Sequence, residues 1–311
     1  MHRTIEIALS PAGTEQLLAE LRSNEHVLGL SIQRGASIKP PGDIVVVQTL
    51  NRGADAVMQA VAAAGKRGPV SVATAELASL TDVEHQKAID NDVDEALWEE
   101  LETGLRHQGK VTSNFLCLMS LGGVIAGAGL IALDEPHLQT MAAVAAAVIA
   151  PGFEPLAKIP LGIILKRREV VWRGIISTIL GYAVLILAAA ITYWLLKFLG
   201  GAPESEVLAA SKHVKALVEP SRPDLVISAC GAFAGIVIQS AFRRSVIAGA
   251  LIAMRLIDAA ALIGIALALG RFDLVGQGLE RLGLDLIFII GAGLIVFGMK
   301  QIFVHRRAPI R

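Results

Sequence analysis

Two prolines with a carboxylate between them lie inside a long apolar stretch of the chain. The stretch runs from His137 to Leu165 and contains Pro151-Gly152-Phe153-Glu154-Pro155. Proline has no amide hydrogen, and its ring clashes with the carbonyl four residues earlier, so it interrupts a helix. A carbonyl freed in hydrocarbon is costly unless protein or a wet cavity satisfies it. The pattern therefore predicts a broken membrane helix, and it favours a binding site at the break.

The composition supports a membrane protein with a soluble part. Of the 311 residues, 54% are hydrophobic, and the mean hydropathy is +0.60. Residues 82–109 carry nine acidic residues against two basic ones, whereas residues 110–311 carry 19 basic residues against 12 acidic ones. We therefore expect a soluble domain at 1–80, an acidic amphipathic connector helix at 81–110 and a membrane domain at 111–311.

The first region alternates between strand-like and helix-like patterns. Apolar residues occur at every second position in 3–10, 27–34, 43–50 and 70–75, and at helical spacing in 11–23 and 55–64. This succession, β-α-β-β-α-β, predicts an α+β ferredoxin-like domain. No phosphate-binding glycine motif is present, so a structural or assembly role is favoured over ligand sensing. The first residues lack the hydrophobic region of a signal peptide, and the domain is expected in the cytoplasm.

The connector has one apolar stripe on an acidic helix. Its members fall at every fourth position: Ile89, Val93, Leu97, Leu101 and Leu105. A stripe of this kind packs either on the N-terminal domain or on a second protomer. Together with the glycine-rich spans, it predicts a homodimer or higher homo-oligomer.

Six apolar segments of the third region approach or exceed the roughly 20 residues that cross a bilayer. They are 113–133, 138–165, 170–199, 225–242, 245–269 and 284–303. Six spans put both termini on one side. That face carries twelve Lys and Arg residues and the opposite face six, so both termini are predicted in the cytoplasm of a multi-pass protein of the cytoplasmic (inner) membrane. Gly123/Gly127 and Gly231/Gly235 have the spacing of close helix packing, which is favoured over pore lining.

Three spans followed by three spans of opposite direction are the pattern expected of a 3+3 inverted repeat. The second and fifth spans then correspond, and both contain ionisable residues: Glu154 and Lys158 in one, Arg255 and Asp258 in the other. These residues could pair within each helix or across the repeat interface, either as structural ion pairs or as a polar site. The candidate ion- or solute-binding residues are Pro151, Gly152, Phe153, Glu154, Pro155, Lys158, Arg255 and Asp258.

The run Asn114–Leu165, with its glycine-rich first span and Ala150-Pro151-Gly152-Phe153-Glu154-Pro155, resembles a bacterial membrane family. This is domain-of-unknown-function family 389, the uncharacterised hydrophobic-domain proteins. The resemblance covers roughly residues 110–305, and a soluble domain ahead of the membrane core also fits it. Small or apolar residues are typical between the two prolines, so Glu154 departs from the pattern. The resemblance implies no activity, substrate or site residue.

Two functions remain open at this stage. The first is a transporter or channel-like protein for an ion or small solute, with a midplane polar site at the broken helix. The second is a membrane-anchored sensor or assembly protein that acts through its cytoplasmic domain. No catalytic constellation is readable, so the chain is not expected to be an enzyme. Its two cysteines and its scattered histidines suggest no metal site, and no cofactor or nucleic-acid partner is expected.

Overall fold

The structure is a computed structural model that describes residues 2–133, 135–241 and 246–310, with side chains of the last segment described from Arg255 on. The chain divides into two compact units. The first comprises Met1–Leu101, Ser240–Arg243 and Gln301–Arg311, and the second comprises Glu102–Gln239 and Arg244–Lys300. The predicted boundaries at residues 80 and 110 therefore differ from this division, because the connector is shared between the units.

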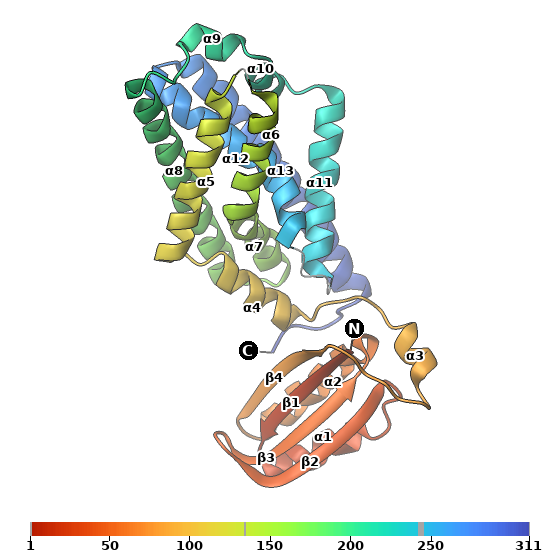
Figure 1. Cartoon of the computed structure of the whole chain (residues 1–311). Coiled ribbons are helices and arrows are strands. Elements are labelled where there is room, and N and C mark those ends of the chain that lie inside the picture. The colour runs from red at the N-terminus through yellow and green to blue at the C-terminus, as the bar shows by residue number, and fades with distance from the viewer. Residues whose placement is uncertain (1, 134, 242–245, 311) are drawn as a thin grey trace. The chain divides into compact units, whose positions relative to one another are not determined.

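The first unit contains a four-stranded antiparallel sheet and two helices in the succession β-α-β-β-α-β (Figure 1). The sheet order is β2-β3-β1-β4, and in its register Ile5 lies opposite Val47 on one side and Thr74 on the other. The elements are β1 (His2–Leu9), α1 (Pro11–Leu21), β2 (Val27–Ile38), β3 (Pro41–Thr49), α2 (Asn51–Ala64) and β4 (Val70–Leu77).

The core of this unit lies between one face of the sheet and the two helices. Side chains alternate between the two faces of a strand, so Ile5 and Ile7 of β1 point the same way as Val45 and Val47 of β3. The apolar stripes of α1 and α2 cover them, and Leu17 of α1 is fully buried there. Each such side chain contributes about 1.5–3 kcal/mol when buried.

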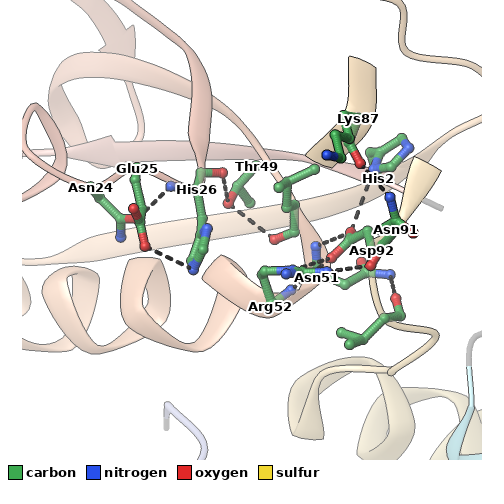
Figure 2. A network of polar contacts seen from close by, with 12 residues as sticks. His2, Asn24, Glu25, His26, Thr49, Asn51, Arg52, Lys87, Asn91 and Asp92 are labelled. Atoms are coloured by element: carbon green, nitrogen blue, oxygen red, sulfur yellow. Dashed lines mark hydrogen bonds and ion pairs between the residues drawn. The ribbon is translucent and has the colours of Figure 1, made fainter. Parts of the chain in front are cut away.

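The connector is not one helix, and that prediction is wrong. It forms α3 (Gln86–Asp90) and α4 (Trp98–Gln108) with an irregular segment between them. The Asp92 carboxylate accepts hydrogen bonds from the backbone amides of Asn51 (2.6 Å) and Arg52 (3.3 Å; Figure 2). The side-chain amide of Asn51 donates to the Val93 carbonyl (2.7 Å). The bonds from Asp92 satisfy the first two backbone amides of α2, which have no partner within the helix. The bond to Val93 occupies a carbonyl that would accept an intrahelical hydrogen bond if the connector were one continuous helix. Tertiary bonding has overridden the helical periodicity.

The predicted apolar stripe divides accordingly. Leu97 is buried in the core of the N-terminal unit, whereas Val93 is 41% exposed. Of the two alternatives for the stripe, packing on the N-terminal domain is therefore the one that Leu97 adopts. The stripe no longer supports a contact between protomers.

The second unit is helical, and its apolar helices are those of a multi-pass membrane protein. Among the described residues, α5, α8, α11 and α13 are each long and apolar enough to cross a bilayer, and α6 and α7 reach that length and apolarity only as a pair bent at the break between them. The helices are α5 (Ser113–Ile131), α6 (Pro136–Ile149), α7 (Phe153–Ile164), α8 (Arg168–Phe198), α9 (Ser205–Ala210), α10 (Lys212–Val218), α11 (Arg222–Ser240), α12 (Val246–Leu269) and α13 (Phe272–Phe303).

Glycines bring α5 close to two neighbours. A Cβ on Gly123 would collide with the Leu185 carbonyl of α8, and one on Gly127 would lie 3.3 Å from the Ala189 Cα. On another face of α5, a Cβ on Gly122 would lie 2.6 Å from the Ala150 Cβ. The absence of a side chain therefore allows backbone-to-backbone approach, as the Gly123/Gly127 spacing predicts.

The middle of α12 is enclosed by other helices, because every residue from 256 to 266 is buried. Gly264 lies against the Ile186 carbonyl of α8, and Gly278 of α13 lies against Ile263. A helix buried on all sides presents its polar side chains to other helices rather than to lipid.

Candidate functional site

The helix break is present where the prolines predict it. Helix α6 ends at Ile149, α7 begins at Phe153, and the two are bent by 48°. Pro151 lies in the break, and Pro155 lies in the first turn of α7, where no intrahelical amide bond is lost. Glu154 is in the same turn, and a carboxylate there is favoured by the positive end of the helix dipole. This local role accounts for an acid at the break without a ligand.

A tyrosine of α8 closes the break. The Tyr182 hydroxyl donates to the Gly152 carbonyl at 3.3 Å, and the Gly152 amide donates to the Ala150 carbonyl at 2.8 Å. A Cβ on Gly152 would lie 2.9 Å from the Tyr182 oxygen. Sequence analysis missed Tyr182, although a tyrosine within a span must find an acceptor when buried and was a usable signal.

Lys158 does not form the predicted ion pair with Glu154 in the described part of the chain. Its side chain is buried, and its ammonium group donates to the Gly109 carbonyl at the end of α4. A Cβ on Gly109 would lie 2.8 Å from the Lys158 nitrogen and 3.1 Å from the Pro155 nitrogen. The absence of a side chain at Gly109 leaves room for this approach, and its backbone carbonyl takes the place of the carboxylate as the partner of Lys158.

Arg255 and Asp258 also have partners other than those predicted. Arg255 Nη2 lies 3.0 Å from Asp224 Oδ1 in the first turn of α11. Asp258 Oδ2 lies 3.9 Å from Nε2 of His213 in α10. Among the described residues, neither pairs with the other, nor with Glu154 or Lys158. The eight predicted residues thus form two groups, six around the break and two on α12.

A second buried pair, which sequence analysis missed, lies on α13. Arg281 Nη2 is 3.0 Å from Asp285 Oδ1 and 2.5 Å from Ser228 Oγ of α11, and both charged side chains are buried. Nε and Nη1 of Arg281 have no hydrogen-bond partner in the described residues. The predicted span began at 284 and left Arg281 in a loop, whereas α13 begins at Phe272. The spacing of four between Arg281 and Asp285 was the available signal.

These side chains converge on a small cavity. It measures about 30 Å³, and its polar wall is formed by Ser228, Arg255 and Asp285. A cavity of this size can hold a water molecule. We refer to these three residues, the ion-pair partners Asp224 and Arg281, and Asp258 one turn after Arg255 as the polar cluster. With all groups ionised, its two arginines and three aspartates leave one net negative charge.

The break and the polar cluster are neighbours. A Cβ on Gly152 would lie 3.8 Å from the Ile257 side chain of α12, one residue before Asp258. The Tyr182 hydroxyl, which donates to the Gly152 carbonyl, and the middle of α12 therefore both lie at the break.

A wider groove lies beside α9 and α10. It measures about 740 Å³, and Gln139, Thr140, Lys212 and His213 provide its polar wall. His213 belongs to a short helix outside the long apolar ones. Partial burial lowers the pKa of His213, and the positive charge of Arg255 lowers it further.

The described residues contain no group of three or more His, Cys, Asp or Glu side chains that could hold a metal ion. Cys117 and Cys230 are free thiols.

Comparison with known proteins identifies the family of the region that carries this site. Residues 147–291 match the family model described as Domain of unknown function (DUF389). Over these residues the chain is similar to that family. The resemblance stated from the sequence is confirmed over these residues. The DUF389 region contains Pro151 to Lys158, Tyr182 and the whole polar cluster. No curated protein and no solved structure matches the chain.

Proposed function

We propose that the chain is a transporter or channel-like membrane protein for an ion or small polar solute, rather than an enzyme, and that the polar cluster is its site. One observation carries the proposal: polar side chains of three helices, Ser228 of α11, Arg255 of α12 and Asp285 of α13, line one cavity. Charged residues at membrane depth are costly, and they typically mark solute or ion pathways.

The cluster fits this role better than the break itself. At the break, the Gly152 carbonyl accepts a hydrogen bond from Tyr182, and the Lys158 ammonium group donates one to the Gly109 carbonyl. In the cluster, two donors of the Arg281 guanidinium have no partner in the described residues. A buried charged donor without an acceptor is strongly destabilising, so water or a solute that supplies the acceptor would bind there.

The proposed architecture has six spans, with α12 as the additional one. Helix α12 has 24 residues and is long enough to cross a bilayer. The spans α5, α6–α7 and α8 would correspond to α11, α12 and α13 in a 3+3 inverted repeat. The order β2-β3-β1-β4 supports a ferredoxin-like assignment for the soluble domain. The distribution of Lys and Arg supports a cytoplasmic (inner) membrane location with both termini in the cytoplasm.

Flux into proteoliposomes tests the proposal. Radiolabelled sodium, rubidium, chloride, phosphate and amino acids are the probes, and Asp285→Asn is the test variant. The matched control is Asp273→Asn, because Asp273 forms an exposed pair with Arg271. We expect Asp285→Asn to lower flux by about tenfold or more, since a hydrogen bond to a charged group contributes about 1.5–3 kcal/mol. Equal flux in both variants, or no flux of any probe by the wild type, would contradict the proposal.

The alternative, a sensor or assembly protein, is favoured by one observation. The C-terminal segment Gln301–Arg311 belongs to the same compact unit as the N-terminal sheet. The chain therefore leaves this unit after Leu101 and returns to it at Ser240–Arg243 and again at Gln301, so a change in the unit could act on several points of the helical unit. Absence of flux together with ligand binding by the soluble unit would favour this function. The homo-oligomer stays a prediction, which native mass in detergent tests.

A further inference from the structure

His213 and Asp258 connect the groove to the polar cluster. His213 lines the groove, and its side chain is 30% exposed, whereas that of Asp258 is 7% exposed. The two side chains approach to 3.9 Å, an ion-pair distance that a movement of less than about one ångström turns into a hydrogen bond. A partly exposed histidine therefore lies next to a buried carboxylate.

The groups around this pair come from several helices. Arg255 lies one turn before Asp258 on α12 and pairs with Asp224 of α11. Arg281 and Asp285 belong to α13. The side chains of Tyr182 of α8 and Ile257 of α12 both lie within 4 Å of the position that a Cβ on Gly152 would take. Helix α5 has no acidic, basic or histidine residue, and the single such residue of α6 is His137, which is exposed in its first turn.

We propose that His213 and Asp258 form a proton-binding pair, through which protons from the groove reach the polar cluster. The inference rests on the proposed transport function and names its coupled ion. A hydronium ion in the groove gives its proton to the neutral imidazole of His213 and leaves a water molecule. The imidazolium N–H then passes its proton to Asp258 Oδ2, which leaves a neutral imidazole and a neutral carboxyl group.

Charge balance gives this transfer its direction. With all groups ionised, the polar cluster carries one net negative charge, and an uncompensated buried charge is costly. One proton on Asp258 makes the cluster neutral. The low pKa of His213, which burial and Arg255 cause, suits a relay that is neutral at rest and releases its proton readily.

The first test is a histidine titration by NMR on the full chain in nanodiscs. The chain has seven histidines, and His213→Gln identifies the signal of His213. Asp258→Asn removes the negative neighbour, so the His213 midpoint should fall by about one unit or more. The His137 signal is the internal control and should not move. An unchanged His213 midpoint in Asp258→Asn would overturn the proposal.

The second test is proton entry into liposomes that contain a pH-sensitive dye, under an imposed pH gradient. Asp258→Asn should abolish entry, and His213→Gln should slow it by about tenfold or more, as loss of a proton-transfer group does. His137→Gln should behave as the wild type. Equal entry in His213→Gln and His137→Gln would contradict the relay.

The two proposals can fail separately. Solute flux that is independent of both residues and of the pH gradient would leave the transport function standing and overturn the proton pair. Coupled titration of His213 and Asp258 without flux of any solute or of protons would retain proton binding by the pair, and would overturn its coupling role together with the transport function.

Discussion

Arg307 and Glu99 form a two-point ion pair although they lie 208 residues apart in the chain. Nη1 and Nη2 of the guanidinium lie 2.7 and 2.8 Å from the two carboxylate oxygens. The Ile310 amide donates to the same carboxylate at 2.8 Å, and Arg307 also contacts Asp55 of α2. Parallel bonds of this kind combine charge with fixed geometry. The C-terminal tail is thereby part of the N-terminal unit.

Arg307→Met should destabilise that unit by about 3–5 kcal/mol, because Glu99 and Asp55 would lose the partner that compensates their burial. The double variant Arg307→Met with Glu99→Gln should be less unstable than the single one. Hydrogen exchange of the β1–β4 amides measures the effect. Arg22→Met is the control, since Arg22 is exposed, and it should change stability by less than about 0.5 kcal/mol. Equal protection in the two single variants would argue against a structural role for the tail.

Acid should release the tail. Burial opposes ionisation of Asp55, but its hydrogen bond to His305 and the charges of His305 and Arg307 hold its pKa below the ordinary value of 3.8. Burial likewise opposes ionisation of Glu99, and Arg307 and the Ile310 amide hold its pKa below 4.5. A carboxyl with a lowered pKa stabilises the fold above its ordinary pKa, and this stabilisation is lost as the pH falls through the folded value.

The pH dependence follows from these signs. Exchange of the tail amides, corrected for intrinsic rates, should be constant above about pH 5 and rise below about pH 4. Asp55→Asn with Glu99→Gln should flatten the profile, whereas Asp82→Asn, at a less buried position, should leave it unchanged. A profile that stays flat down to pH 3 in the wild type would contradict this account.

Glycine packing in α5 should be sensitive to a single methyl group. Gly123→Ala would drive a Cβ into the Leu185 carbonyl, and we expect it to lower stability by about 1–3 kcal/mol. Gly291→Ala is the matched control on α13, where a Cβ meets nothing within 4 Å. That change should be neutral or stabilising by up to about 1 kcal/mol, because alanine is the better helix former. Thermal unfolding in detergent compares the two; equal effects would exclude close packing of α5 on α8.

Tyr182→Phe removes the donor at the helix break. The Gly152 carbonyl would be buried without its partner, which costs about 1–3 kcal/mol. Tyr193→Phe makes the same chemical change at a bond to the Pro203 carbonyl. Pro203 is only partly buried, so water can replace the lost hydroxyl there and the effect should be smaller. If the two variants have the same melting temperature, Tyr182 does not hold the break.

Cysteine labelling tests the predicted topology. In a background without Cys117 and Cys230, an impermeant reagent applied from outside should label a cysteine at Ser211 and spare one at Arg168. Labelling at Arg168 would contradict cytoplasmic termini. The loop at Arg243, predicted on the same side as Arg168, lies outside the described residues.

Local patterns were sufficient for the elements of the fold. Alternation with period two predicted all four strands, and apolar runs predicted α5, α8, α11 and α12 to within a few residues, whereas α13 begins at Phe272 rather than at 284. The break at Pro151 could be predicted because a missing amide hydrogen acts within a single turn of its own helix. The resemblance to DUF389 also followed from one continuous stretch of chain.

Partner choice was decided only by the tertiary structure. Asp92 bonds the start of α2 some 40 residues earlier and so divides the connector. Lys158 takes a carbonyl rather than Glu154 because Gly109 leaves room for it. Arg281 belongs to the polar cluster because it lies on the face of α13 that packs against α11, where it bonds Ser228. A side chain's own neighbours in sequence reveal its periodicity, but its bonds depend on which helices pack against it, and that depends on the shape of the whole unit.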